Sequence, residues 1–219
     1  MTDGRNDTRE PEVAGQPVGS WLSELASAAP TPGGGGAAAM TAAVAAGLVE
    51  MVCNLTVGRP RYAEHSEHAA AVLERATALR GQALALVTED ATAFDALMAT
   101  FKLPRSDEAE RAARTAAVQR ATEAAARVPL RIAALAAEVV QLAEQLPGRS
   151  NPNVLSDVGV AASTAAAALE SAALNVEINL SGLTDQQARQ RLTVDLATHT
   201  AAVDRGRKLF DQVRGEING

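Results

Sequence analysis

One carboxylate stands out among the side chains that could do chemistry, because it interrupts an apolar seam. The seam has steps that alternate between four and three residues: Val72, Ala76, Leu79, Ala83, Leu86, Asp90, Ala93 and Leu97. Such spacing is typical of one buried face of a long helix. A carboxylate on that face must be paired, be protonated or serve a function, and an internal salt bridge or a helix-capping contact is the structural alternative. We interpret Asp90 as a functional residue.

Four consecutive glycines, Gly33, Gly34, Gly35 and Gly36, precede the most apolar segment of the chain. Their letters formally satisfy a dinucleotide-binding fingerprint, but that fingerprint needs a preceding strand and a surrounding βαβ unit, and neither is predicted. Two interpretations remain for this loop. Either the glycines permit close packing, or free N–H groups at the start of the next helix face a polar or anionic ligand group.

A second group of polar residues follows one line along a predicted helix near the C-terminus. The line comprises Asp157, Thr164, Ser171, Asn175 and Asn179, and it could form a pocket wall or hydrogen bonds between helices. Arg59 and Arg61 flank Pro60 in a turn and could meet an anionic ligand or simply be exposed. The charged stretch 64–68 has ligand-like spacings, but a solvated helix face explains it better, so we predict no metal site.

The elements that must position these residues are predicted to be helices. Hydrophobic residues make up 47% of the chain and aromatic residues only 2%, so alanine, the best helix former, supplies much of the apolar content. Long helices are expected over about 37–57, 62–100, 107–146 and 153–180, and a last helix is expected to start from a capping box at 184–187. Pro129 should kink or divide the helix over 107–146. The predicted fold is an all-α bundle of about six to seven helices with no sheet. Residues 1–17 are expected to be a disordered tail and 18–219 one helical domain.

Charge and composition exclude several classes of partner. The net charge of −6 argues against a nucleic-acid surface, which needs clustered lysine and arginine. Segment 37–57 is long enough to cross a membrane, but Glu50 and Asn54 would be costly in lipid, so a buried helix is expected. The lone Cys53 cannot form an internal disulfide, and the N-terminal residues lack the apolar stretch of a secretory signal; both favour the cytoplasm.

Taken together, six motifs in this order resemble the cyclodeaminase/cyclohydrolase family of folate enzymes. That family includes the cyclodeaminase domain of formiminotransferase-cyclodeaminase and stand-alone methenyltetrahydrofolate cyclohydrolases. The matching segments are SAAPTPGGG (27–35), MVCNLTVG (51–58), DATAF (90–94), KLP (102–104), NPNVLSDVGVAA (151–162) and AALNVEINL (172–180). Two positions depart from the family pattern: Gly36 stands where a serine is usual, and Arg59-Pro60-Arg61 replaces a lysine-rich turn.

The resemblance implies an all-helical, homodimeric protein that binds a tetrahydrofolate derivative as substrate and needs no other cofactor. It places Asp90 as general base and counter-charge to a cationic carbon, with Gly33, Gly34 and Gly35 as a wall of the folate site. The remaining residues that it implicates in substrate binding are Asn54, Asn175 and Asn179 for the pterin edge, Asp157 for its amino group, and Arg59, Arg61 and Lys102 for the glutamate carboxylates. The expected activity is that of a methenyltetrahydrofolate cyclohydrolase. The alternatives are a formiminotetrahydrofolate cyclodeaminase and a non-catalytic folate-binding or scaffold protein.

Overall fold

Within residues 12–219, the part of the chain that the computed structural model describes, there are six α-helices and no strand. The α-helices are α1 (Val18–Leu25), α2 (Gly34–Asn54), α3 (Ser66–Thr100), α4 (Glu108–Ala143), α5 (Leu155–Ser181) and α6 (Gln186–Asn218). Three short 3-10 helices accompany them: η1 (Glu12–Gly15), η2 (Pro60–His65) and η3 (Pro152–Val154). The predicted all-α bundle is confirmed.

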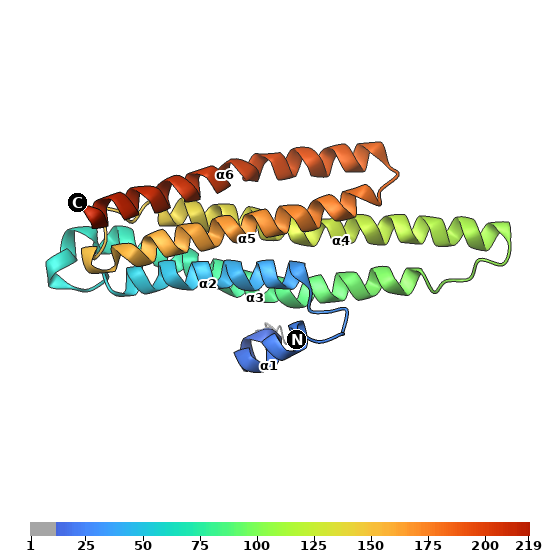
Figure 1. Ribbon diagram of the computed structural model, residues 1–219, viewed down its shortest axis with the longest axis horizontal. Coiled ribbons are helices and arrows are strands. Elements are labelled where there is room, and N and C mark those ends of the chain that lie inside the picture. Colours follow the sequence, from blue (N-terminus) through green and yellow to red (C-terminus); the bar gives the residue numbers. More distant parts are fainter. Residues whose placement is uncertain (1–11) are drawn as a thin grey trace, which may run out of the picture.

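The five long helices lie side by side along the long axis of the molecule, and α1 lies apart from them near α2 and α3 (Figure 1). Helix α2 packs against α3 and α5, while α5 also packs against α4 and α6. Helices α2 and α5 run in opposite directions, so the glycine-rich start of α2 lies beside the end of α5. One end of the bundle therefore collects the glycine loop together with the C-terminal part of α5.

Several helix ends lie a few residues from the predicted positions: α2 begins at Gly34 instead of about 37, and α3 begins at Ser66 instead of about 62. Two further features also differ from the sequence prediction. Helix α4 continues through Pro129 as one element of 36 residues. The buried packing of the Pro129 ring offsets the missing backbone donor there, so the helix is not divided. Helix α6 is capped by Asp185, whose side chain accepts from the N–H groups of Gln187 and Ala188, while Thr184 bonds to Gln119 instead of acting as the cap.

Regular structure within the described part of the chain is already present before residue 18. Residues Glu12–Gly15 form η1, and Val13 packs against the hydrophobic core. The expected disordered tail therefore does not extend to residue 17, because a single apolar side chain anchors this turn on α3. Residues 1–11 of that expected tail lie outside the described part of the chain.

Helix α2 is the central apolar element. By length and composition alone it could cross a membrane, but 56% of its 18-residue apolar stretch is buried inside the bundle. Alanines such as Ala39, Ala42 and Ala46 have no exposed surface. Small side chains of this kind let helix axes approach closely: a Cβ added at Gly206 on α6 would lie 2.9 Å from the carbonyl oxygen of Ala162 on α5.

The outer sides of α2 and α5 carry two rows of small and apolar side chains that are exposed or half-buried. The row on α2 is Gly34, Ala37, Thr41, Val44, Leu48 and Met51, and the row on α5 is Val160, Ser163, Ala167, Ser171, Leu174 and Ile178. Helix α4 packs against both α2 and α5. We call the surface formed by the two rows the α2–α5 face. Exposed apolar rows at three- and four-residue spacing are typical of a helix seam that lacks its partner.

Candidate functional site

A cavity of about 320 Å³ lies at the end of the bundle where α2 begins and α5 ends. Helices α3 and α4 close its other sides. Its lining residues are Pro30, Thr31, Gly33, Gly34, Gly35, Asp90, Ala93, Phe94, Leu97, Ala125, Asn175, Ile178 and Asn179. Six residues predicted from the sequence meet here: the catalytic candidate, three glycines and two asparagines. This cavity is the candidate active site.

Asp90 enters the cavity from α3 and lies against the first turn of α2. The backbone N–H of Gly36 donates to its carboxylate, and the positive end of the α2 dipole favours the charge. Gly35 makes this approach possible, since an added Cβ would lie only 2.6 Å from Cγ and 2.7 Å from Oδ2 of Asp90. The helix-capping contact weighed from the sequence is therefore present, and the same carboxylate also faces an open cavity.

Burial governs the protonation of this carboxyl group. Desolvation raises the pKa of Asp90 above its ordinary value, and the hydrogen bond from Gly36 lowers it by a smaller amount. Among the described residues, no cation forms a salt bridge with Asp90. A carboxylate with a raised pKa that faces a cavity without a paired cation is suited to accept a proton or to attract a cationic ligand.

Asn175 and Asn179 give the α5 wall its polar character. The Asn175 side-chain N–H donates to the carbonyl of Ser171 at 2.8 Å, and that of Asn179 donates to the carbonyl of Asn175 at 2.8 Å. Each bond uses one of the two N–H donors of its side-chain amide and leaves the second N–H and the Oδ1 acceptor available. The Asp90 carboxylate and the two Oδ1 atoms are thus acceptors in the polar lining. Such a lining suits a ligand that carries N–H donors or positive charge.

The apolar wall contains residues that the sequence analysis did not single out as binding residues. Phe94 and Leu97 follow Asp90 by one and two turns of α3, and Ile178 follows Asn175 on α5. All three lie within helical spacing of a predicted site residue, which is the signal that could have identified them. They provide an apolar surface next to the acceptors.

Four of the predicted substrate-binding residues lie at the opposite end of the bundle. Asn54 ends α2, about 30 Å from Gly34 at 1.5 Å per residue, and Arg59 and Arg61 are exposed in the turn that follows. Asp157 lies in the first turn of α5, about 27 Å from Asn175. These four side chains do not reach the cavity.

Lys102 is also absent from the cavity lining. It is exposed two residues beyond the end of α3, and the ten residues from Asp90 to that end span about 15 Å.

The polar line on α5 is divided between the two ends of the bundle, since Asp157 lies at one end and Asn175 and Asn179 lie at the other.

Motif residues at the far end hold the structure together. Thr56 is fully buried, and its hydroxyl accepts from the N–H of Asn151 at 3.0 Å. The Asn151 side chain accepts from the Tyr62 hydroxyl at 2.8 Å and donates to the carbonyl of Leu55 at 3.3 Å. These bonds tie the end of α2 to the start of η3 and α5. Part of the family pattern thus serves the fold at this end.

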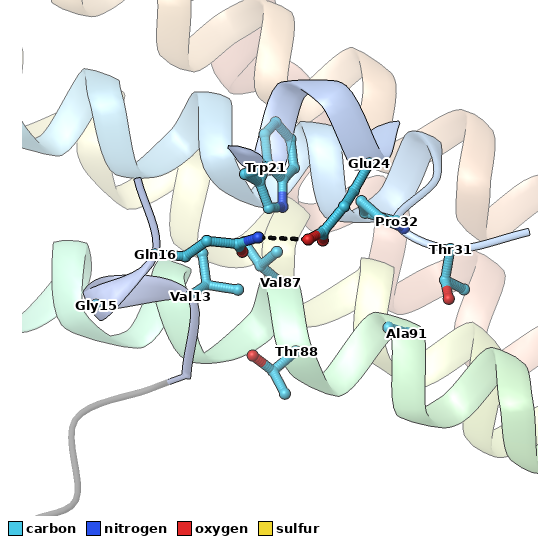
Figure 2. A pocket seen from close by; sticks show the side chains of 10 residues that line it. All are labelled: Val13, Gly15, Gln16, Trp21, Glu24, Thr31, Pro32, Val87, Thr88 and Ala91. Atoms are coloured by element: carbon cyan, nitrogen blue, oxygen red, sulfur yellow. Dashed lines mark hydrogen bonds between the residues drawn. The ribbon is translucent and has the colours of Figure 1, made fainter. Parts of the chain in front are cut away.

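A second cavity, of about 500 Å³, shares Thr31 with the first and lies between η1, α1 and α3 (Figure 2). The Gln16 side chain donates to Glu24 at 2.7 Å inside it, so this carboxylate already has a partner. A Cβ added at Gly36 would lie 3.5 Å from Pro32 Cβ and 3.7 Å from Val87 Cγ1, and both residues line this second cavity. A side chain at position 36 would therefore lie toward the second cavity, so the replacement of the family serine by Gly36 removes no side chain from the cavity that contains Asp90.

Comparison with known proteins agrees with the motif pattern. Residues 17–198 match the family described as formiminotransferase-cyclodeaminase. This chain belongs to that family. A relative within the formiminotransferase-cyclodeaminase family is the methenyltetrahydrofolate cyclohydrolase of Methylorubrum extorquens, which is 41% identical over 92% of this chain and 97% of that protein.

Two further relatives carry the cyclodeaminase name. The formimidoyltransferase-cyclodeaminase of Rattus norvegicus is 32% identical over 78% of this chain, which spans about a third (32%) of that protein's length. The crystal structure of formiminotetrahydrofolate cyclodeaminase from Thermotoga maritima superposes with a TM-score of 0.84 at 26% identity, covering 95% of this chain and all of that one (100%). This chain therefore shares its helical bundle with that cyclodeaminase.

Proposed function

We propose that this protein is a methenyltetrahydrofolate cyclohydrolase, an enzyme that opens the five-membered ring of 5,10-methenyltetrahydrofolate with water to give 10-formyltetrahydrofolate. The observation that carries the proposal is the Asp90 carboxylate at the cavity. Gly35 leaves room for this carboxylate, and the Gly36 N–H donates a hydrogen bond to it. The 41% identity with a cyclohydrolase over nearly the whole chain supports the same activity.

The reaction needs a base beside a cation, and the cavity provides one. The methenyl carbon lies between N5 and N10 in an amidinium cation, whose charge the Asp90 carboxylate complements. Water attacks this carbon while Asp90 takes one of its protons, which leaves a neutral tetrahedral adduct with a hydroxyl group. Asp90 then returns the proton to N5, the carbon–N5 bond breaks, and the hydroxyl proton leaves to solvent as the formyl group forms on N10. One proton is released in total, which matches the loss of the cationic charge.

Substrate charge and Asp90 protonation are linked. Burial raises the pKa of Asp90 in the free protein, which favours the protonated acid. A bound cation at short range stabilises the carboxylate and lowers that pKa again. The base is thus generated where the cationic carbon lies. The apolar surface of Phe94 and Leu97 limits water around the pair and strengthens their attraction.

The same cavity also suits the cyclodeaminase reaction, in which N10 attacks the formimino carbon and ammonia leaves. The structural likeness to the Thermotoga maritima cyclodeaminase is the observation that keeps this second candidate. Purified protein supplied with methenyl- and formimino-tetrahydrofolate in parallel separates the two. We expect rapid loss of the methenyl chromophore and little ammonia from the formimino compound. Ammonia release without methenyl hydrolysis would favour the cyclodeaminase, and inactivity on both would favour a non-catalytic protein.

We further propose that the protein works as a homodimer in the cytoplasm and needs no cofactor besides its folate substrate. The exposed rows on α2 and α5 support the dimer, because a second copy would bury them. The single Cys53, a free buried thiol, is consistent with a reducing compartment. Light scattering that gives a dimer mass at micromolar protein is the expected result, and a monomer mass would contradict the dimer.

A further inference from the structure

The cavity between η1, α1 and α3 lies beside the candidate active site but is distinct from it. It measures about 500 Å³ against about 320 Å³, and Thr31 is the one described residue that lines both. We call it the η1–α1 cavity (Figure 2). Sites for small molecules commonly have volumes of about 300 to 1,000 Å³. The proposed hydrolysis uses none of the side chains in this cavity, so it does not account for their arrangement.

Apolar side chains form one part of the wall of the η1–α1 cavity. Trp21 is 5% exposed and Val87 is 2% exposed, and Val13 and Pro32 also line the cavity. The indole of Trp21 is flat and electron-rich, so it attracts planar rings and cations that lie near its surface. In Figure 2 its nitrogen points toward the Gln16–Glu24 pair, so an aromatic ring and a carboxylate meet in one part of the cavity.

The charge in this cavity is negative. Glu24 is the only charged residue among the described lining residues, and within residues 12–219 no cation forms a salt bridge with it. Its Oε1 accepts one hydrogen bond, from the neutral amide of Gln16 at 2.7 Å. A carboxylate has room for about four such bonds, so most of its acceptor capacity remains open. The cavity therefore favours a ligand with N–H donors or positive charge and repels an anion.

The hydroxyl of Thr88 is an independent sign of a ligand. Its Oγ1 is buried and has no hydrogen-bond partner in the described part of the chain. Threonines on helices often donate to the carbonyl one turn earlier, as Thr41 does at 2.8 Å and Thr92 at 2.9 Å. Thr88 does not, and it lies across the cavity from Trp21 in Figure 2. A buried hydroxyl without a partner destabilises a protein, so a group that bonds to it gains affinity.

We propose that the η1–α1 cavity is a second binding site, for a planar ring that carries two adjacent N–H donors. The two N–H groups of such an edge match the two oxygens of Glu24, and the ring lies against Trp21. A further polar atom of the ring bonds to the Thr88 hydroxyl. Asp90 takes no part in this site, which therefore goes beyond the proposed hydrolysis.

Trp21 reports binding directly, because it is the only tryptophan of the chain and lines this cavity and not the one that contains Asp90. Benzamidine carries the donor edge on an aromatic ring, and benzoate is an anion of the same shape. Benzamidine should change the Trp21 emission until saturation, and benzoate should not. Emission that does not respond to benzamidine, or that responds equally to benzoate, overturns the proposal.

Two variants locate the bound benzamidine. Glu24→Gln keeps the size of the side chain and removes its charge, so it should weaken benzamidine binding by about 10-fold. Asp90→Asn removes the charge of the other cavity and should bind benzamidine as tightly as wild type does. Unchanged binding in Glu24→Gln, or weakened binding in Asp90→Asn, would overturn the assignment to the η1–α1 cavity. These titrations need no turnover, so their result is independent of the proposed activity.

The donor edge occurs both in guanine bases and in the pterin ring of folates, and competition distinguishes the two sources. Equilibrium dialysis of benzamidine with the Asp90→Asn protein is repeated with guanosine and with tetrahydrofolate. Displacement by guanosine supports a site for a free base, displacement by tetrahydrofolate supports a second site for a pterin, and displacement by neither overturns the assigned ligand class.

Thr88→Val tests the inner end of the site. The valine replaces the unpartnered hydroxyl by a methyl group, so the free protein should melt at a higher temperature. The competitor that displaces benzamidine carries further polar atoms on its ring, and it should bind this variant about 2- to 10-fold more weakly. Benzamidine has no such atom and should bind equally well to the variant and to wild type. Equal binding of the competitor to both proteins would overturn the contact with Thr88.

Discussion

Replacing Gly35 by alanine changes one hydrogen into a methyl group at the point where α2 meets Asp90. That methyl carbon would lie 2.6 Å from Asp90 Cγ, whereas carbon atoms normally rest about 3.5 to 4.0 Å apart. Relief of the clash therefore requires Asp90 or the start of α2 to move by about 1 Å. A displacement of this size in a catalytic group can lower the rate about 100-fold.

The effect of Gly35→Ala on stability is much smaller than its effect on rate. Overpacking costs about 1 to 3 kcal/mol, and replacing a helical glycine by alanine returns about 1 kcal/mol. The net cost is about 0 to 2 kcal/mol, and at about 2 to 4 °C per kcal/mol the Tm should fall by no more than about 8 °C. Loss of activity should therefore greatly exceed loss of folded protein at the assay temperature.

The next residue provides a matched control. A methyl group at Gly36 would make ordinary contacts with Pro32 and Val87, at 3.5 and 3.7 Å, and would keep the backbone N–H that donates to Asp90. Gly36→Ala should keep its activity and gain up to about 1 kcal/mol of stability. Turnover of methenyltetrahydrofolate and circular dichroism melts of both variants decide the matter. A Gly35→Ala protein with wild-type kcat/KM would refute the reasoning that the position of Asp90 controls the reaction.

Three further predictions concern single side chains. Asp90→Asn should lower kcat by about 100- to 10,000-fold. Because burial raises the Asp90 pKa, this variant should also gain stability relative to wild type as the pH rises from about 3.9 to that raised pKa. Denaturation curves that show no such trend would contradict a buried carboxyl group at this position. Cys53, whose pKa burial and the nearby Glu50 raise to about 12, should resist a thiol reagent at pH 8 in the folded protein and react fully after unfolding. Asn151→Ala removes three side-chain hydrogen bonds and should lower the unfolding free energy by about 2 to 3 kcal/mol in chemical denaturation, and an unchanged midpoint would show that the Asn151 contacts contribute nothing.

Much of the fold could be predicted from local patterns. The spacing of apolar residues identified the long helices. The sequence allows either Ser106 or Asp107 as the cap of α4, and the cap is Asp107, whose side chain accepts from the N–H of Glu110. The errors arose where packing overrides local preference. Pro129 stays inside α4 because its ring is buried, and the cap of α6 is Asp185 because Thr184 is engaged by Gln119 from another helix.

The site was predictable where one residue broke a pattern. Asp90 interrupts an apolar seam, and Asn175 and Asn179 share a helix face, so the sequence alone marks them. The sequence could not show at which end of the bundle each predicted residue lies. Asn54 and Gly34 belong to one helix and to neighbouring motifs, yet 21 residues of rigid helix hold them at opposite ends. The contacts of Asn151 with Thr56 and Tyr62 join segments about 90 residues apart, and no local pattern encodes them.

The placement of Trp21 gives the protein a built-in optical reporter. It is the only tryptophan of the chain, it is the only buried residue of α1, and it lines the cavity shown in Figure 2. Emission from the indole therefore follows the docking of α1, whereas far-ultraviolet circular dichroism follows the five long helices. A short helix held only by the buried Trp21 and the half-buried Leu25 detaches at a lower cost than the bundle unfolds. Heating should accordingly shift the fluorescence before the helical signal is lost, and a folate that orders Thr31 should bring the two transitions together.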